Sequence, residues 1–496
     1  MRSGHCTTAL VIATGPKSKR FSCEVRTQQL IRPKNVLSGA SYSQARRQPN
    51  RHSLRLMSPG KNSLTQHQER RSSQPRRKLW LLWPVILAGE AIFLLPFVLP
   101  RLFRPTMLEA WGITNLDFGL AFSCYGMVAI IAYGLGGPLA DRFPPRWLMC
   151  IALAATAGGG IAFLETPNRV LLCCIYAYFG ITTILLFWSS MLKVTHDLGG
   201  AKQQGTAFGL LDAGRGLFAA VIATALTLLF GQLLPLKDEA SPEELAKALR
   251  AIIMVTILVV ATTALLIPIA LIKLSRRESS KPTSLETRNS LSLLIRRPAI
   301  WLHGLVVLCA YCGYKSIDNY GIFAVDAFHS SDLEATRLTT LTFWARPFSA
   351  IGAGLVADRF SHFKSMAILF LLAAIGNASL ALIVPQTLQW SGLMMVAVST
   401  AATMYGLRGI YFAVFDDLHI PPTLVGTAAG LVSLIGFLPD VFFGTVTGFM
   451  IDHYPGRQGH QYVFALVCLV SLIGLIACLL NYKHTTNQAT TPGDNA

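Results

Sequence analysis

Apolar segments close to 20 residues long recur twelve times along this chain, and they constrain its fold more than any other feature. A helix of about 20 apolar residues is long enough to cross the hydrocarbon core of a bilayer. Of the 496 residues, 52% are hydrophobic and only 14% are charged, whereas a soluble protein carries roughly 25% charged residues. The sequence therefore predicts a polytopic membrane protein built from helices.

The predicted spans fall into two groups of six, because a polar segment from Lys273 to Arg297, with seven Lys and Arg residues, separates the sixth span from the seventh. We predict two helical bundles (79–273 and 299–482), a linker (274–298), and disordered ends (1–78 and 483–496). The spans are expected at about 79–100, 117–139, 147–164, 168–191, 205–231, 250–273, 299–323, 335–357, 363–384, 390–414, 424–450 and 461–482.

Residues 1–78 hold 17 Lys and Arg residues and two acidic ones, so most of the formal net charge of +18 lies there. Their polar composition without apolar periodicity is typical of disorder. Three interpretations stay open: an organelle targeting segment, a polybasic segment that binds anionic lipid, or a translation start assigned too early, with Met57 as the true start. The rest of the chain is nearly neutral, so nucleic-acid binding is not expected.

The basic residues of the loops predict the orientation. An even number of spans puts both termini on one side, where the loops include the linker, Arg142, Lys193, Arg359 and Lys483. The longest loop on the other side, residues 232–249, offsets its basic residues with four acidic ones. We therefore expect both termini and the linker in the cytoplasm.

Two short motifs occur once in each half, at corresponding places. Gly137–Phe143 (GPLADRF) is matched by Gly354–Phe360 (GLVADRF), and Gly205–Gly209 (GTAFG) is matched by Gly426–Gly430 (GTAAG). Two matches at nearly one offset indicate two bundles of similar fold, related by an axis normal to the membrane, as in transporters built from parallel repeats.

The first motif resembles the signature of the major facilitator superfamily of secondary transporters, which lies between helices 2 and 3 with a weaker copy between helices 8 and 9. The resemblance covers residues 79–482. It implies an all-α membrane protein with twelve transmembrane helices in two pseudo-symmetric six-helix bundles, placed in the bacterial inner membrane. It also implies a small-molecule substrate, and we expect a monomer without a cofactor.

Segments 187–193 and 203–216 are similar to permeases near the organic-anion and sugar-phosphate branch of that family. Organophosphate antiporters of the family place an arginine within helix 1. Here that helix has Glu90, and Arg101 is predicted at its outer end, which disfavours a phosphate ester. No GxxxxGK[ST] or HExxH motif occurs and the histidines are not spaced for a metal, so neither an enzyme nor a metal site is expected.

Charged residues inside the spans are functional candidates, because each costs about 2.5–3.5 kcal/mol to insert on biological scales. Asp212 and Arg215 are three residues apart on one predicted helix, and Lys315 and Asp318 are three apart on another, so each pair shares a helix face. Each pair is either a structural ion pair or part of the transport machinery. Glu90 is alone on its helix, as either a proton-coupling or a structural carboxylate. The candidates outside the substrate site are Glu90, Asp212, Arg215, Asp318 and Asp440.

Arg346 and Arg408 have no acid three or four residues away on their own helices. Each therefore needs a ligand or a salt bridge to another helix, with Asp440 or Glu90 as the expected partner in the second case. A guanidinium donates two parallel hydrogen bonds to a carboxylate, which suits a planar anion. With neighbouring aromatic residues, the predicted substrate-binding set is Lys315, Trp344, Arg346, Tyr405, Arg408 and Tyr411.

The repeated motif is predicted to act as a cytoplasmic gate. Asp141 and Asp358 would accept hydrogen bonds from Arg146 and Lys364, or from the N-terminus of a helix in the other half, in one state only. The glycines, Gly136 among them, would let helices approach closely. A purely structural turn is the alternative. The gate residues are Gly137, Asp141, Arg142, Arg146, Gly354, Asp358, Arg359 and Lys364.

The predicted function is secondary active transport of a small organic anion, a carboxylate or a sugar acid, by alternating access. A proton or a counter-substrate would supply the energy. A neutral sugar or a sugar phosphate is the alternative substrate. A non-transporting receptor on the same scaffold is the alternative of another class.

Overall fold

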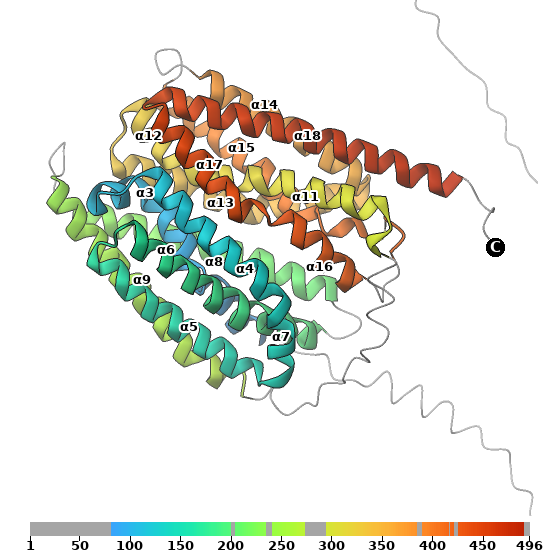
Figure 1. Ribbon diagram of the computed structural model, residues 1–496, viewed down its shortest axis with the longest axis horizontal. Helices are drawn as coiled ribbons and strands as arrows, with labels where there is room; N and C mark the ends of the chain where they lie inside the picture. The colour runs from blue at the N-terminus through green and yellow to red at the C-terminus, as the bar shows by residue number, and fades with distance from the viewer. Residues whose placement is uncertain are drawn as a thin grey trace, which may run out of the picture. The chain divides into compact units, whose positions relative to one another are not determined.

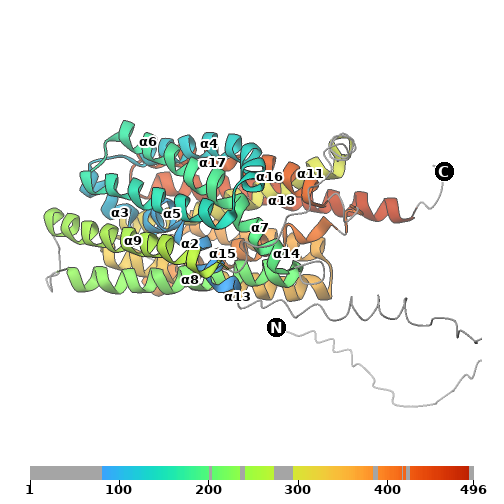
Figure 2. The ribbon, with the colours of Figure 1, turned by 90° about the horizontal axis from the view of Figure 1, so that it is seen from below.

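The computed structural model describes residues 81–199, 204–234, 241–272, 294–383, 389–415, 417–420 and 425–490, and all regular structure in these ranges is helical. Long helices run along one common direction (Figures 1 and 2). Helices are expected in lipid, because every backbone polar group must be satisfied inside its own segment. The predicted N-terminal extension and most of the linker lie outside the described residues.

In the first half, the described helices follow the six predicted spans. Span 1 is made of several segments, and span 4 contains a π-helical stretch. They are α2 (Leu82–Ala91), η2 (Leu94–Val98), α3 (Leu99–Trp111), α4 (Asn115–Arg142), α5 (Pro145–Ile161), η3 (Ala162–Glu165), α6 (Arg169–Gly180), η4 (Ile181–Trp188), α7 (Ser189–Gly199), α8 (Gln204–Leu233) and α9 (Pro242–Ala270).

The second half repeats this order, with breaks in its first and fifth spans. Its described helices are α11 (Pro298–Ser316), η5 (Ile317–Asn319), α12 (Tyr320–Phe328), α13 (Asp332–Arg359), α14 (His362–Leu382), α15 (Trp390–Ile410), η6 (Ala413–Phe415), α16 (Val425–Gly436), α17 (Pro439–His453) and α18 (Arg457–Thr490).

Each half packs around its own core. One cluster of buried apolar side chains extends from Leu82 to Leu271, with Phe343 as its contribution from the second half. A second cluster extends from Leu294 to Cys478. Outside these cores, many large apolar side chains are exposed, such as Leu265 at 70% and Leu382 at 77%. Such a surface is expected where lipid replaces water.

Ten described helices are long and apolar enough to cross a membrane, and the bent pair at the start of the first half makes eleven. The remaining predicted span is α13, which is 28 residues long. It does not qualify by composition, because threonines and charged residues such as Arg337 and Arg346 interrupt its apolar character. With α13, the described helices account for the twelve predicted spans.

The first span is longer than predicted, because it bends instead of ending near residue 100. Leu82–Ala91 and Leu94–Trp111 meet at 43°. Pro96, within η2, lacks the N–H that would continue the α-helical hydrogen bonds. Arg101 and Arg104 lie within the second segment, and they are only 4% and 5% exposed. The prediction that Arg101 lies at the outer end of this helix is therefore wrong.

Spans 7 and 11 are also interrupted where charged residues occur. The short 3₁₀ turn η5 separates α11 from α12 and contains Asp318. In span 11, Phe437 and Leu438 separate α16 from α17, whose first turn holds Asp440. Broken helices at midplane depth are the places where transporters of this kind build their binding sites.

Two ends of the bundle are distinguished by their connections. The linker end is where α4 meets α5, α13 meets α14 and α9 leads into the linker. The far end is the opposite one. Three helices that start at the far end, α4, α9 and α13, begin with a capping box in which a Thr or Ser is paired with an acidic residue three positions on.

The halves contact each other closely at the far end. The Asp452 carboxylate accepts hydrogen bonds from the backbone N–H groups of Asn115 and Leu116, at 3.2 and 2.6 Å, at the start of α4 in the other half. A carboxylate at a helix N-terminus is stabilised by the helix dipole. The Thr227 and Thr340 hydroxyls lie 2.6 Å apart. These contacts join the two halves at the far end.

Glycines make the close approach of α4 and α17 possible. A Cβ atom added at Gly119 would lie 2.2 Å from the carbonyl oxygen of Gly444, and one at Gly126 would lie 2.5 Å from the carbonyl carbon of Asp440. Backbone atoms cannot move aside as side chains do. We infer that Gly119 and Gly126 let α4 of the first half approach α17 of the second half closely.

Replacing Gly119 by alanine is expected to lower the free energy of unfolding by about 1–3 kcal/mol, since overpacking forces the two backbones apart. Gly134→Ala, on the same helix, is the matched control, because a Cβ there meets nothing within 4 Å. It should instead stabilise the helix by about 0.5–1 kcal/mol. Thermal unfolding of both purified variants checks this, and equal melting temperatures would contradict it.

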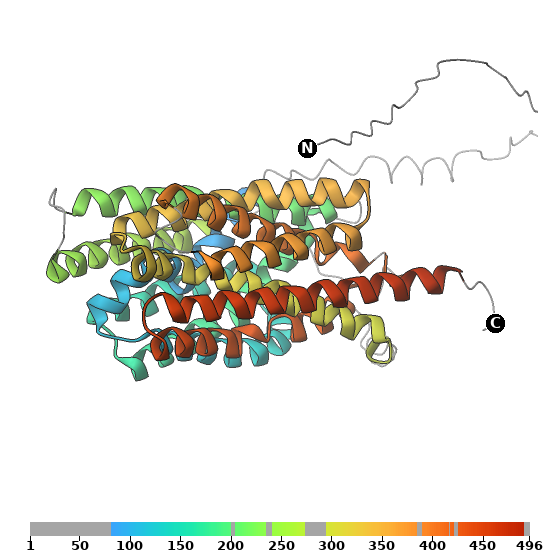
Figure 3. The same cartoon turned by 90° about the horizontal axis from the view of Figure 1, so that it is seen from above.

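The C-terminal end differs from the prediction in one further respect. Helix α18 continues to Thr490, past the predicted boundary at residue 482, and Figure 3 shows it extending beyond its neighbours. The segment after Tyr482 has no proline or glycine before Pro492. Since the residue before a proline is disfavoured in the helical conformation, Thr491 is a natural limit for the helix.

Candidate functional site

A cavity lies between the two halves and is lined by residues from both. Its lining residues come from spans 1, 2, 4 and 5 of the first half and from spans 7, 8, 10 and 11 of the second. Of the predicted substrate-binding residues, Lys315, Arg346 and Arg408 line this cavity. Charged and aromatic side chains dominate the remaining surface.

One group of four charges in and beside the cavity, which we call the Glu90 cluster, consists of Glu90, Asp212, Arg215 and Arg346. Arg346 Nη1 donates to Glu90 Oε1 at 3.2 Å and Nη2 to Asp212 Oδ1 at 3.5 Å. Arg215 Nε lies 3.2 Å from Glu90 Oε2, but these two atoms do not meet the geometry of a hydrogen bond, so this contact is Coulombic. The cluster has two positive and two negative members.

The predicted pairing within α8 is therefore wrong, because Asp212 and Arg215 bind different partners. Asp212 reaches Arg346 of the other half, and Arg215 reaches Glu90 of α2. The two side chains are buried to different extents, since that of Asp212 is 42% exposed and that of Arg215 is 7% exposed. Residues three apart on a helix share a face, but the acid from a neighbouring helix is the nearer partner here.

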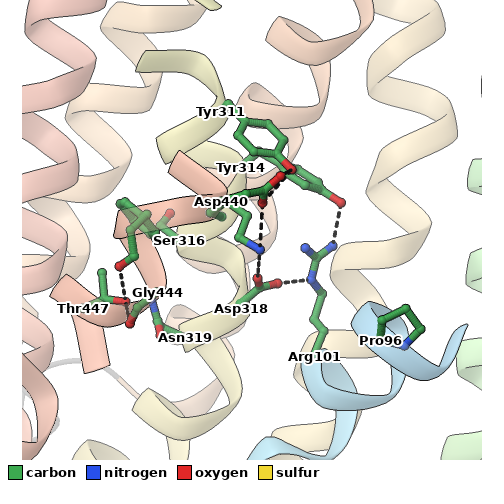
Figure 4. A network of polar contacts seen from close by, with 12 residues as sticks. Pro96, Arg101, Tyr311, Tyr314, Ser316, Asp318, Asn319, Asp440, Gly444 and Thr447 are labelled. Atoms are coloured by element: carbon green, nitrogen blue, oxygen red, sulfur yellow. Dashed lines mark hydrogen bonds and ion pairs between the residues drawn. The ribbon is translucent and has the colours of Figure 1, made fainter. Parts of the chain in front are cut away.

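The second group, the Lys315 cluster, consists of Arg101, Lys315, Asp318 and Asp440. Lys315 Nζ lies 3.6 Å from Asp318 Oδ2 and 3.5 Å from Asp440 Oδ1. Arg101 donates to Asp318, and Figure 4 shows the side chains of Arg101, Asp318 and Asp440 close together. The predicted i, i+3 contact of Lys315 with Asp318 is present, within a larger and also neutral group.

Each cluster joins the two halves through an arginine of its own. Arg101, on α3, reaches Asp318 of the second half, and Arg346, on α13, reaches Glu90 of the first. The carboxylates of Glu90 and Asp318 and the four basic side chains of the two clusters are less than 15% exposed. A change in the relative position of the halves must therefore break or exchange these buried contacts.

Aromatic rings cover the cationic side chains. Lys315 Nζ lies 4.3 Å from the ring centroid of Phe122 and 5.0 Å from that of Phe97. The guanidinium of Arg215 lies 5.3 Å from Phe93. A cation over an aromatic face gains about 0.5–2 kcal/mol, more when water is excluded. These rings compensate part of the cost of burying charge.

Arg408 differs from the other cations of the cavity. Among the described residues, it forms no hydrogen bond and no ion pair, and its guanidinium lies 4.3 Å from the ring centroid of Tyr314. It lines the cavity. The site therefore contains one guanidinium whose charge no described carboxylate neutralises by direct contact.

The predicted aromatic contacts are misplaced. Tyr405 and Tyr411 are 1% and 3% exposed, belong to the core of the second half and do not line the cavity. Trp344 donates its indole N–H to Thr224 Oγ1 at 2.9 Å, between the two halves. All three lie within three residues of an arginine in the sequence. Trp344, at i−2 of Arg346, falls on another side of its helix, and Tyr405 and Tyr411, at i−3 and i+3 of Arg408, pack into the core of the second half.

The structure adds cavity residues that the sequence analysis missed, above all Arg101, Tyr311 and Tyr314. Tyr311 donates to both oxygens of Asp440, at 3.1 and 3.0 Å. Tyr314 accepts a hydrogen bond from Arg101 Nη1 at 3.4 Å. The sequence contains a pattern that indicates Tyr311 and Tyr314 as cavity residues, because residues 311, 314, 315 and 318 fall on one helix face at i, i+3, i+4 and i+7.

The predicted gate motif lies at the linker end, outside the cavity. Asp358, at the end of α13, is 76% exposed at its side chain and lies 3.6 Å from Nε2 of His362, the first residue of α14. His362 Nδ1 lies 3.1 Å from Asp417. Lys364 instead lies over the ring of Tyr482, at 5.8 Å. Asp358 lies at the end of α13 and Lys364 in the first turn of α14, and no contact between the two is described.

The first copy of the motif is described only in part, because the side chain of Asp141 lies outside the description. The Arg146 guanidinium is 5.7 Å from the ring of Trp147, and Arg142 and Arg359 are exposed. A Cβ added at Gly137 or Gly354 would meet nothing within 4 Å, so the expected close approach at these glycines is not found. At Gly136 it is found, since a Cβ would lie 2.8 Å from Ser189 Oγ.

Known proteins resemble this chain along most of its length. The inner membrane protein YqcE of Escherichia coli (strain K12) is 25% identical over 423 residues, which cover 82% of this chain and 96% of YqcE. The inner membrane protein YihN of the same organism is 24% identical over 431 residues, which cover 83% of this chain and 97% of YihN.

Solved structures share the fold. A bacterial homologue of the human lysosomal transporter Spinster, inward-facing and unoccupied, superposes with a TM-score of 0.62 at 16% identity, over 85% of this chain and 100% of that one. The nucleoside transporter NupG gives 0.61 at 16% identity, over 81% and 99%. A model of the Major Facilitator Superfamily matches residues 86–444. The chain therefore belongs to the major facilitator superfamily, and it is a multi-pass membrane transporter with the twelve-helix fold of that family.

Proposed function

We propose that this transporter moves a small organic monoanion, a carboxylate or a sugar acid, through the cavity between its halves. The observation that carries the proposal is the guanidinium of Arg408, which lines the cavity without a described hydrogen-bond or ion-pair partner. A charge within a membrane protein is costly unless something neutralises it. An anion that enters the cavity supplies the missing partner through a pair of charge-assisted hydrogen bonds.

The balance of charges supports a substrate with a single negative charge. The Glu90 cluster and the Lys315 cluster each have two cations and two anions. Arg104 donates to Asn319 at 2.9 Å and does not line the cavity. One positive charge thus remains in the cavity. A carboxylate neutralises it, whereas a phosphate monoester leaves an excess of negative charge.

Transport by alternating access follows from the contacts between the halves. The halves are joined at the far end by direct contacts, such as that of Asp452 with α4. We propose that the linker end is cytoplasmic, as its basic residues favour, so that the contacts at the far end lie on the outer side of the membrane. A proton or a counter-substrate would drive the cycle, and Glu90 and Asp440 are the carboxylates of the cavity available for coupling. We expect the protein to work as a monomer.

Flux measurements with the purified full-length protein in proteoliposomes test this proposal. The panel consists of monoanions (lactate, benzoate and gluconate), dianions (succinate and glycerol 3-phosphate) and neutral glucose. Each compound is measured with and without a pH gradient, and with and without the same compound inside. We expect saturable uptake of at least one monoanion, and little of the dianions or glucose. Stimulation by the gradient or by internal substrate then identifies the coupling.

Two outcomes would contradict the proposal in different ways. A monoanion that raises the melting temperature without any flux would favour the receptor, because binding would occur without transport. Uptake confined to glucose or glycerol 3-phosphate would exclude the monoanion as substrate and leave the transporter intact.

A further inference from the structure

We propose that the monoanion carries a flat apolar body, so that an aromatic carboxylate, not a sugar acid, is the preferred substrate; this inference rests on the proposed function. The first support is the composition of the cavity wall. Of the 18 lining residues, seven are charged, nine are aromatic, and the other two are Val98 and Ile184. Among the described lining residues there is no serine, threonine, asparagine or glutamine.

The aromatic rings form a continuous surface on each side. In the first half, Phe97 contacts Tyr125 at 4.9 Å and Phe93 at 6.0 Å between ring centroids, and Phe93 contacts Trp188 at 6.3 Å. We call these four residues the first aromatic wall. Rings at these separations stabilise each other and present their faces and edges together. The wall therefore offers both ring faces and ring edges to the apolar body of a ligand.

The second aromatic wall consists of Tyr311, Tyr314 and Phe437, extended by Tyr133 from the first half. Tyr311 and Tyr314 are stacked at 5.6 Å, Tyr311 meets Phe437 edge-on at 4.9 Å, and Phe437 stacks on Tyr133 at 6.2 Å. Arg408 lies over Tyr314, at one end of this wall. An aromatic acid bound by its carboxylate at Arg408 would therefore have aromatic rings beside its apolar body.

The hydrogen-bonding capacity of the lining is the second support. The hydroxyls of Tyr125, Tyr311 and Tyr314 already have partners, and the carboxylates Glu90 and Asp440 are in ion pairs. Among the described lining residues, Glu90 Oε2, Arg215 Nε and Lys315 Nζ have ion pairs but no hydrogen bond. The polar groups with neither are the Arg408 guanidinium, the Tyr133 hydroxyl and the Trp188 indole N–H. All three donate hydrogen bonds, as an anion requires.

A sugar acid needs acceptors for its own hydroxyl groups, and each hydroxyl that is buried without one reduces its affinity. The cavity offers few acceptors that are not already engaged. An aromatic carboxylate presents only acceptor oxygens and an apolar ring. Its two parts match the free donors and the two aromatic walls, respectively.

Binding of four probes to the detergent-solubilised full-length protein tests the inference. The probes are 2-naphthoate, its saturated counterpart decahydronaphthalene-2-carboxylate, gluconate and neutral 2-naphthalenemethanol. Dissociation constants are measured by calorimetry and by thermal-shift titration. We expect 2-naphthoate to bind about two- to tenfold more tightly than the saturated acid, which is the contribution of ring contacts. Gluconate and the neutral alcohol should each bind roughly tenfold or more weakly than 2-naphthoate.

Phe437→Leu tests whether the second aromatic wall causes the preference for the flat acid, since it removes one ring of that wall and keeps an apolar side chain. The preference for 2-naphthoate over the saturated acid should shrink toward one. Phe442→Leu, the same substitution in the same span at an exposed position outside the lining, should leave that preference unchanged. Should Phe437→Leu not fold, the comparison of probes on the unaltered protein still decides the question.

Equal binding of the flat and the saturated acid, or tighter binding of gluconate, would overturn the aromatic inference while the organic-anion function stands. Absence of binding and of flux for every monoanion would overturn both.

Discussion

Replacing Arg408 by methionine is expected to abolish uptake of the transported anion and to leave the melting temperature unchanged or slightly raised. Loss of one partner of a buried charge-assisted contact costs on the order of 2–5 kcal/mol of binding. The folded protein loses no ion pair, because Arg408 has none among the described residues. Its guanidinium contacts the ring of Tyr314. Uptake in proteoliposomes and thermal unfolding of the same preparation measure the two effects.

Arg408→Lys separates charge from geometry. Lysine keeps the positive charge but has no planar pair of donors. A charged hydrogen bond contributes about 1.5–3 kcal/mol, so we expect the apparent KM to rise about ten- to hundredfold. Arg346→Met is the contrasting variant, because Arg346 contacts both Glu90 and Asp212 and its removal should lower stability as well. Normal uptake by Arg408→Lys would remove the guanidinium from substrate recognition.

The second large effect is expected at Glu90, where Glu90→Gln should destabilise the protein by about 3–5 kcal/mol, the usual cost of breaking a buried ion pair from one side. Glutamine removes the charge that faces both Arg215 and Arg346. Arg346 keeps Asp212, but Arg215 retains only the rings of Phe93 and Trp188. The loss is measured as a lower melting temperature and a lower yield of folded protein.

A double variant shows whether the unpaired guanidinium is the cause. Glu90→Gln combined with Arg215→Gln removes the orphaned charge, so part of the lost stability should return. Glu109→Gln is the matched control, since Glu109 is exposed on the same bent span, and a surface change of this kind is worth within about 0.5 kcal/mol. The explanation fails if the double variant is less stable than Glu90→Gln alone.

Most of the fold was predictable from one-dimensional patterns. Lipid requires apolar helices of a set length, so the runs of apolar residues predict the spans, and the matched motifs at residues 137–143 and 354–360 indicate the repeat. Arg346 and Arg408 were also recognisable as cavity residues, because neither has an acid on its own helix face. Local rules were enough wherever the cause was local.

The errors in the site arise where the chain bends or where two helices meet. Arg101 seemed to end a span, but the helix continues beyond the bend to Trp111 and Arg101 is buried within it. The prolines of that stretch are visible in the sequence, yet they do not reveal the direction of the bend. Asp212 and Arg215 seemed to pair with each other, whereas acids and arginines of other helices lie nearer.

By itself, the sequence determined the class of protein, the number of spans and the two-fold repeat, because these depend on apolar periodicity, length and local motifs. Only the tertiary structure decided which charges neutralise each other, which rings line the cavity, and that Arg408 alone among its cations has no described acidic contact. Ion pairing between helices depends on distances across the bundle, and no spacing along the chain encodes those distances.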